Sequence, residues 1–255
     1  MGVRNYIIKK KEHDEKLFKQ PPPNDDCPIC FLRLPSLNTG WRYYVCCGKV
    51  ICSGCIHAPV YDDQGNEVDN QKCPFCRTPK SNKERARRIK KRVDAGDANA
   101  MHILGYDYRD GRYGYPQDYT KALELFHRAA DLGCAHANSG IGYAYSNGKG
   151  VERDEKKANY YYELAAMGGD VCARYNLGVR EQYRGNMDRA LKHLMIAVRS
   201  GDSVSLKIIK QLYSNGHATK EDYTKALQLY QECLGEIKSD QRDEAAATDE
   251  DDRYY

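Results

Sequence analysis

The chain has 255 residues, of which 40 are Lys or Arg, 36 are Asp or Glu and 11 are Cys, and its formal net charge is +4. Its mean hydropathy of −0.80, without an apolar run near the ~18 residues of a membrane span, excludes a membrane-spanning protein. The first residues lack the apolar core of a secretory signal, so we expect an intracellular protein, cytoplasmic or nuclear. Cysteines stay reduced in these compartments, so this many of them indicate bound metal rather than disulfides.

The first segment, residues 1–23, is rich in charge and ends in three consecutive prolines at 21–23. Proline lacks the backbone N–H that a helix or sheet needs, so this end cannot extend a regular element. We therefore expect residues 1–23 to be a disordered charged leader.

The second segment, residues 24–79, concentrates cysteine. It holds three Cys-x-x-Cys pairs and one adjacent pair, which are Cys27 with Cys30, Cys46 with Cys47, Cys52 with Cys55, and Cys73 with Cys76. Eight thiolates are enough for two tetrahedral zinc sites, and a two-residue spacer lets both sulfurs of a pair reach one ion. A segment this short has little core, so metal would be its main source of stability. The sequence predicts a zinc module with two zinc ions.

The order of these pairs resembles a RING finger of the subclass that uses cysteine throughout. The resemblance implies a cross-brace, in which one ion is bound by Cys27, Cys30, Cys52 and Cys55, and the other by Cys46, Cys47, Cys73 and Cys76. The family separates its third and fourth ligands by at least one residue, whereas Cys46 and Cys47 are adjacent. This departure requires a local kink, which Gly48 permits, and His57 is the alternative ligand to Cys46.

RING fingers act as E3 ubiquitin ligases without a covalent intermediate, because they bind a charged ubiquitin-conjugating enzyme (E2) and hold its ubiquitin in a reactive pose. The resemblance therefore implies no catalytic side chain. It assigns E2 contacts to Ile29, Pro74 and Arg77, where Arg77 bridges the E2 and ubiquitin. The family's helix aromatic has Tyr61 as its nearest candidate.

Residues 80–95 follow as a basic segment, with eight bases and one acid between 80 and 92. Ala86, Ile89 and Val93 recur at helical spacing. We therefore expect an N-terminal capping helix for the region that follows, with the bases on its solvated face. A nuclear import signal or a nucleic-acid patch is the second interpretation, and nucleic acid is not the expected partner.

Residues 96–238 contain an internal repeat of about four units, which start at Gly96, Gly133, Gly169 and Gly201. Each unit reads as two helices with one apolar face, and one helix pair cannot bury that face alone, so the units must stack into a solenoid. Glycines recur inside the first helices at 105, 142 and 178. A glycine within a helix costs about 1 kcal/mol relative to alanine, so its recurrence predicts close approach between helices.

The repeat resembles Sel1-like repeats, which are relatives of tetratricopeptide repeats. The matching features are Leu104-Gly105 followed by Tyr108, the loop 147–154, and a closing Ala-Ala-x-x-Gly. The third unit has Glu181 in place of the aromatic residue and a shorter loop, and the fourth has Lys210 in place of the glycine. The resemblance implies a mainly α fold, an α-solenoid, with a surface that binds a protein substrate or adaptor.

The last segment, residues 239–255, has seven acids and two bases, and we expect a disordered acidic tail. The isolated Cys134, Cys172 and Cys233 read as buried packing residues. Two functional hypotheses remain open. The first is a RING-type E3 ligase whose repeats recruit the substrate, and the alternative is a non-catalytic zinc-binding scaffold.

Overall fold

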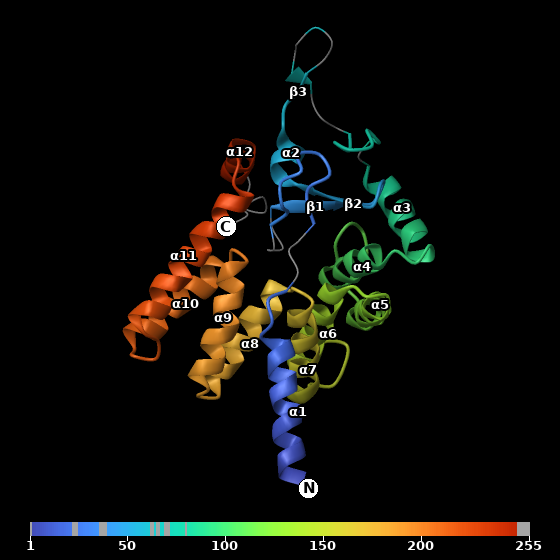
Figure 1. Ribbon diagram of the computed structural model, residues 1–255. Coiled ribbons are helices and arrows are strands. Elements are labelled where there is room, and N and C mark those ends of the chain that lie inside the picture. Colours follow the sequence, from blue (N-terminus) through green and yellow to red (C-terminus); the bar gives the residue numbers. More distant parts are fainter. Residues whose placement is uncertain are drawn as a thin grey trace. The chain divides into compact units, whose positions relative to one another are not determined.

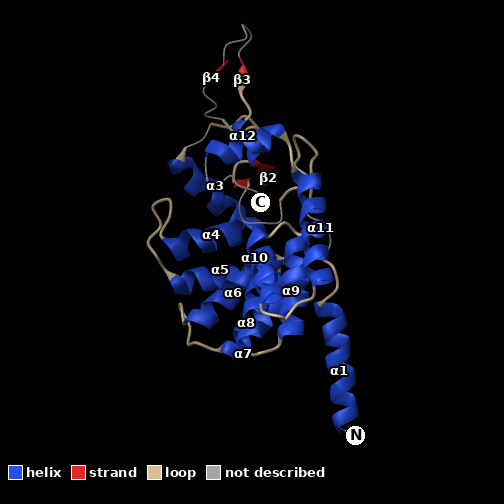
Figure 2. Ribbon diagram, turned by 90° about the vertical axis from the view of Figure 1, so that its left-hand side faces the viewer, coloured by secondary structure: helices blue, strands red, loops and turns tan. Residues whose placement is uncertain are grey.

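The computed structural model describes residues 2–21, 25–35, 40–61, 64, 67–68, 72–79 and 81–248. Within them the chain is mainly helical, as predicted, and its strands lie in the cysteine segment (Figure 2). The chain divides into two compact units. The first unit comprises Met1–Pro23 and Ala135–Gln231, and the second comprises Asn24–Cys134 and Glu232–Tyr255 (Figure 1).

The cysteine module of the second unit is built on short elements. Strand β1 (Trp41–Tyr44) pairs antiparallel with β2 (Lys49–Cys52), helix α2 (Ser53–His57) follows, and β3 (Val60–Tyr61) pairs with β4 (Glu67–Val68). Besides cysteine, the buried cluster contains only Leu34, Ile51 and Ile56 among the described residues. Three aliphatic side chains bury too little apolar surface to stabilise a module of this length.

Three helices complete the second unit's N-terminal part: α3 (Asn82–Asp94), α4 (Ala98–Asp110) and α5 (Tyr119–Asp131). Ile89 and Val93 of α3 are buried, and α3 contacts α4. Asp97 caps α4 and Asp118 caps α5, since each carboxylate accepts a backbone N–H of the first turn. A basic helix therefore precedes the repeats, with its apolar stripe buried.

The remaining repeat helices are α6 (Ala135–Asn147), α7 (Glu155–Met167), α8 (Val171–Tyr183), α9 (Met187–Arg199), α10 (Ser203–Ser214) and α11 (Lys220–Ile237). In the first unit α6 packs along α7, and α8 packs along α9. Asp154, Asp170 and Asp202 cap α7, α8 and α10. The sequence period is therefore a period of capped helix pairs.

The glycines inside the first helices face the second helices at close range, which confirms that prediction. A Cβ placed at Gly105 would lie 2.6 Å from the Phe126 ring, and one at Gly178 would lie 2.9 Å from Leu194. Gly142 faces the Tyr162 ring in the same way, with 3.0 Å to the nearest ring atom. Each large side chain thus occupies the space that a Cβ would fill.

Both ends of the chain contain helices where the charge pattern predicted disorder. Helix α1 (Gly2–Leu17) buries Leu17 completely, and α12 (Asp240–Thr248) buries Ala245 and Ala246. Each helix buries very few side chains. Many of its other residues are charged, which is why the charge pattern alone predicted disorder. Of the described helices, none is both long and apolar enough to cross a membrane.

Candidate metal centre

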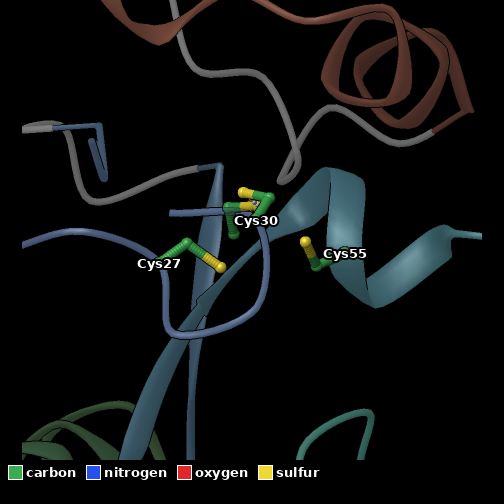
Figure 3. A group of neighbouring side chains, drawn as sticks. Cys27, Cys30 and Cys55 are labelled. Carbon is green, nitrogen blue, oxygen red and sulfur yellow. Dashed lines mark hydrogen bonds between the residues drawn. The ribbon is translucent and has the colours of Figure 1, made fainter. Parts of the chain in front are cut away.

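The eight clustered cysteines form two groups of four, and within each group all sulfurs lie within 4.8 Å of one another. The first group is Cys27, Cys30, Cys52 and Cys55, and the second is Cys46, Cys47, Cys73 and Cys76. Figure 3 shows the side chains of Cys27, Cys30 and Cys55 directed toward one another. The pairs alternate between the groups along the chain, and these are the two sets that the RING resemblance implies.

The first and last cysteine pairs lie on backbone turns of the same kind. The N–H of Cys27 donates to the Leu32 carbonyl at 2.9 Å, and that of Cys73 donates to the Thr78 carbonyl at 2.8 Å. The residue after each pair, Phe31 or Arg77, has a φ near +60°. This left-handed conformation is uncommon outside glycine, and here it closes each turn directly after the second cysteine.

The adjacent pair Cys46 and Cys47 lies in the turn that joins β1 to β2. The N–H of Gly48 donates to the Tyr44 carbonyl at 2.8 Å, and Gly48 has a φ of 69°. The two cysteines are therefore not in extended chain, and the turn brings both sulfurs into one group. His57 ends α2, is exposed, and is not among the four residues of that group.

The sulfur spacing fits a tetrahedral ion. The Sγ atoms of Cys30 and Cys52 are 3.7 Å apart, and those of Cys47 and Cys73 are 3.8 Å apart. Four sulfurs at ~2.3 Å from a central zinc would be about 3.8 Å from one another, whereas a disulfide needs about 2.05 Å. All eight cysteines are free thiols, so two groups of four are present that could hold zinc.

Within each cysteine group, the pKa of one thiol is lowered while that of another is raised. Hydrogen bonds from Cys52 and Cys55 lower the pKa of Cys27, and the hydrogen bond with Cys27 in turn raises the pKa of Cys55. In the second group, burial raises the pKa of Cys47 to about 11. One thiolate therefore opposes ionisation of its neighbours, and a bound cation such as zinc would balance the charge of four thiolates in one group.

Helix α12 contributes to the surroundings of the first group. Its Arg242 is fully buried and donates to the carbonyls of Leu32, Arg33 and Ile237, and its Nη2 lies 3.9 Å from the Cys30 sulfur. Helix α12 also packs against α2, where a Cβ at Gly54 would lie 2.9 Å from the backbone nitrogen of Arg242. Sequence reasoning missed this contact, although the alanines at 245–247 favour a helix.

The basic segment contacts the hairpin that carries Cys46 and Cys47. Arg92 donates to the Val45 carbonyl at 2.6 Å and to Asp97 at 3.0 Å, and the Tyr43 hydroxyl donates to Asp97 at 2.7 Å. Burial opposes ionisation of Asp97, but the hydrogen bonds from Tyr43 and Arg92 lower its pKa. Arg85 forms an ion pair with Asp107 at 2.7 Å. The arginines of α3 therefore connect the hairpin of Cys46 and Cys47 to α4.

The candidate E2 contacts are accessible in the second unit. Ile29 is 36% exposed, Pro74 is half-buried and Arg77 is exposed. Sequence reasoning missed Phe31 and Phe75, which are 77% and 45% exposed next to the same turns. The sequence could have indicated them, because each phenylalanine is adjacent to a cysteine of the module. A module with so few buried residues leaves an aromatic side chain at such a position exposed. The side chain of Tyr61 lies outside the described residues.

Helix pairs with a cysteine-rich module define a helical-repeat protein, and part of its repeat region matches Sel1 repeats, as predicted. The Sel1 repeat family model matches residues 98–134, 135–170 and 211–232. The pair α8–α9, with its shortened loop, lies outside the matched residues. The chain is 39% identical over 88 residues to the ERAD-associated E3 ubiquitin-protein ligase component HRD3B of Arabidopsis thaliana, covering 34% of this chain and 13% of that protein.

Two further relatives extend the comparison. Human protein sel-1 homolog 2 is 31% identical over 123 residues, which are 47% of this chain and 18% of that protein. The E3 ubiquitin-protein ligase DA2 of Arabidopsis thaliana is 42% identical over 55 residues, which are 22% of this chain and 12% of that protein. The chain therefore spans less than a fifth of the length of each of these relatives.

Solved structures resemble the repeat helices. A Sel1 repeat protein from Oxalobacter formigenes has a TM-score of 0.54 and 27% identity, covering 62% of this chain and 66% of its own. A protective antigen of uropathogenic Escherichia coli with an SLR fold has a TM-score of 0.50 and 28% identity, covering 64% and 35%. Both comparisons support the helical-repeat fold class.

Proposed function

We propose that this chain is a RING-type E3 ubiquitin-protein ligase. The cysteine module, with two zinc ions, binds a charged E2, and the Sel1 repeats bind the protein to be modified. The observation that supports this proposal most strongly is that the cysteine pairs alternate along the chain between two groups of four sulfurs with tetrahedral spacing. The exposed Arg77 comes directly after the last of these cysteines, Cys76. The 42% identity over 55 residues to DA2, which is named an E3 ubiquitin-protein ligase, supports this proposal.

In this proposal the chain contributes positioning and no covalent step. The four cysteine pairs would hold two zinc ions, and bound zinc would make the module rigid. Ile29 and Pro74 offer apolar contact to the E2. The N–H of Arg77 donates to the Cys73 carbonyl at 2.9 Å, which fixes the backbone from which its guanidinium extends. A guanidinium has donors in a rigid fork, so one side chain can bind carbonyls of both E2 and ubiquitin.

The alternative function is a zinc-binding scaffold that binds partners through its repeats and does not bind an E2. The adjacency of Cys46 and Cys47 favours this alternative, because it departs from the ligand spacing of RING fingers. Both functions use the same metal sites, so zinc content does not distinguish them, whereas E2 binding does.

The test is self-ubiquitination of the zinc-loaded full chain with a broad panel of E2 enzymes. We expect product with at least one E2, and Arg77→Ala should lower its rate at least tenfold without changing zinc content. Arg87→Ala, which removes an exposed arginine of α3, is the matched control and should leave the rate unchanged. Ile29→Ala should weaken E2 binding. A folded, zinc-loaded chain without product for any E2 would overturn the ligase and favour the scaffold.

A further inference from the structure

Helix α1 is held in the first unit by its last turn. Its residues 8–13 are exposed, Asp14 is half-buried and Leu17 is completely buried. The helix lies beside α7, and its N-terminal end extends away from α7, α8 and α9 (Figure 1). A helix of this length that is bound through one turn resembles a docked peptide more than an element of the core.

Three residues, Asp14, Leu17 and Phe18, anchor this end of the helix. Asp14 accepts from Arg189 with 2.8 Å to each carboxylate oxygen, and the Leu17 carbonyl accepts from Arg174. The Phe18 ring lies 4.7 Å from the His193 ring, with the Arg189 guanidinium 5.1 Å from its centre. Charge-assisted hydrogen bonds and cation–π contacts are directional, so this contact selects for an acid followed by an aliphatic and an aromatic residue.

We call the receiving surface the α1-docking face. It is formed by Glu163 of α7, Arg174 of α8, and Arg189, Lys192 and His193 of α9. Glu163 lies 3.2 Å from the His13 imidazole, and the Lys192 ammonium lies 5.5 Å from the centre of the Phe18 ring. The face therefore touches positions 13, 14, 17 and 18, which lie on one side of the helix end.

The repeat register shows that this face departs from the first and fourth units. Arg174 stands where the first unit has Met101 and the fourth has Leu206.

His193 likewise stands where the first and fourth units have Leu125 and Leu229. The third repeat thus has polar side chains at two positions that are apolar in the first and fourth units, and these two side chains contact Leu17 and Phe18. It is also the repeat that the Sel1 family model does not match at residues 171–210.

The burial of these two polar side chains is energetically unfavourable. Arg174 and His193 are each 1% exposed, and the Nε and Nη2 atoms of Arg174 and the Nδ1 of His193 have no hydrogen-bond partner among the described residues. Burial lowers the pKa of Arg174 to about 10 and that of His193 to about 3. A buried guanidinium with unused donors destabilises the fold. Packing does not require a guanidinium here, since the first and fourth units have methionine and leucine at this position and the second has Asn138.

We propose that the α1-docking face is a peptide-binding site for a partner protein, and that residues 13–18 are its internal occupant. The partner presents the end of a helix with the pattern Asp-x-x-Leu-aromatic, and it binds when the internal segment leaves. The internal segment leaves the Nε and Nη2 atoms of Arg174 without a partner among the described residues, so it does not use all the donors of the face. This site is independent of whether the cysteine module transfers ubiquitin.

The experiment uses the full chain with Leu17→Arg, which sets a second cation against Arg174 and expels the internal segment. A fluorescent peptide of residues 8–21 is the probe. We expect it to bind the variant with a Kd at least tenfold lower than that for the wild-type chain, whose own segment competes. Asp14→Lys in the full chain is the second opening variant and should give the same result. A probe peptide carrying Asp14→Lys should bind at least tenfold more weakly.

Two further variants test the face itself in the Leu17→Arg background. Arg174→Met, which installs the residue of the first repeat, should abolish binding of the probe. Arg199→Ala, which removes an exposed arginine of α9, should leave binding unchanged. Helical circular dichroism and thermal unfolding verify that each variant is folded. Equal binding by wild-type and opened chains, no binding by folded opened chains, or full binding after Arg174→Met would each overturn the proposal.

Discussion

The helical repeats and the cysteine module are stabilised in different ways. The repeats bury small residues against large ones, as Gly105 does against Phe126 and Gly178 against Leu194. The cysteine module has three buried aliphatic residues besides its cysteines. In the repeats, packing determines the position of each helix, whereas in the module the position of the backbone depends on whatever holds the sulfurs together.

The difference extends to the charged residues. In the module, arginines from outside the cysteine segment bind its backbone: Arg92 of α3 binds the Val45 carbonyl, and Arg242 of α12 binds the Leu32 carbonyl. A module with little core thus obtains support from neighbouring helices through hydrogen bonds to its loops. Experiments that unfold one region and leave the other folded therefore distinguish stabilisation by packing from stabilisation through the cysteine sulfurs.

Metal removal should give the largest difference. Structural zinc contributes on the order of 10–16 kcal/mol in small modules, so a chelator should release two ions per chain and unfold residues 25–79. Hydrogen exchange should show lost protection there and retained protection in α6 to α9. Cys52→Ser should prevent zinc binding at the first group, whereas Cys134→Ser, outside both groups, should leave zinc content unchanged. Retained protection of the module without metal would refute this source of stability.

Loss of Arg242 should give the next largest effect. Partners of metal ligands typically change metal affinity about 10- to 100-fold, so Arg242→Ala should accelerate zinc release from the first group about tenfold. Glu244→Ala, at an exposed position of α12, is the control. A chromogenic chelator measures both rates, and equal release from the two variants would show that α12 does not support the metal site.

A methyl group added where two repeat helices are in close contact should lower the free energy of unfolding of the repeats. Gly105→Ala places its Cβ 2.6 Å from the Phe126 ring, and such overpacking costs about 1–3 kcal/mol. Gly235→Ala, where no atom lies within 4 Å, should instead stabilise its helix by up to about 1 kcal/mol.

Urea unfolding followed by far-UV circular dichroism measures the change in the repeats. The fluorescence of Trp41, the single tryptophan, reports on the cysteine module in the same experiment. A higher free energy of unfolding for Gly105→Ala would contradict the packing role of that glycine.

The repeats were predictable from sequence because their packing rule recurs. Leu104-Gly105, Ile141-Gly142 and Leu177-Gly178 keep one register, so the close contacts could be expected before any coordinates. The grouping of the eight cysteines came from the RING resemblance, and the turn at Gly48 explains how two adjacent residues enter one group.

The helices at the two ends were not predictable in this way. Residues 1–20 contain Leu17 and Phe18 in a mostly charged stretch, and their partners Arg174 and His193 are more than 150 residues away. Arg242 is likewise buried against residues more than 200 positions earlier. A charge count describes such segments as solvated, because the few buried positions that anchor them have no period.

The most direct test of the ligase proposal is single-turnover discharge of an E2–ubiquitin thioester onto free lysine, which requires no substrate protein. The zinc-loaded chain should accelerate discharge for at least one E2, and the acceleration should disappear with Arg77→Ala or with chelator but persist with Arg87→Ala. Discharge that stays at the rate of the E2 alone, for every E2 tested with folded and zinc-loaded protein, would contradict the proposal.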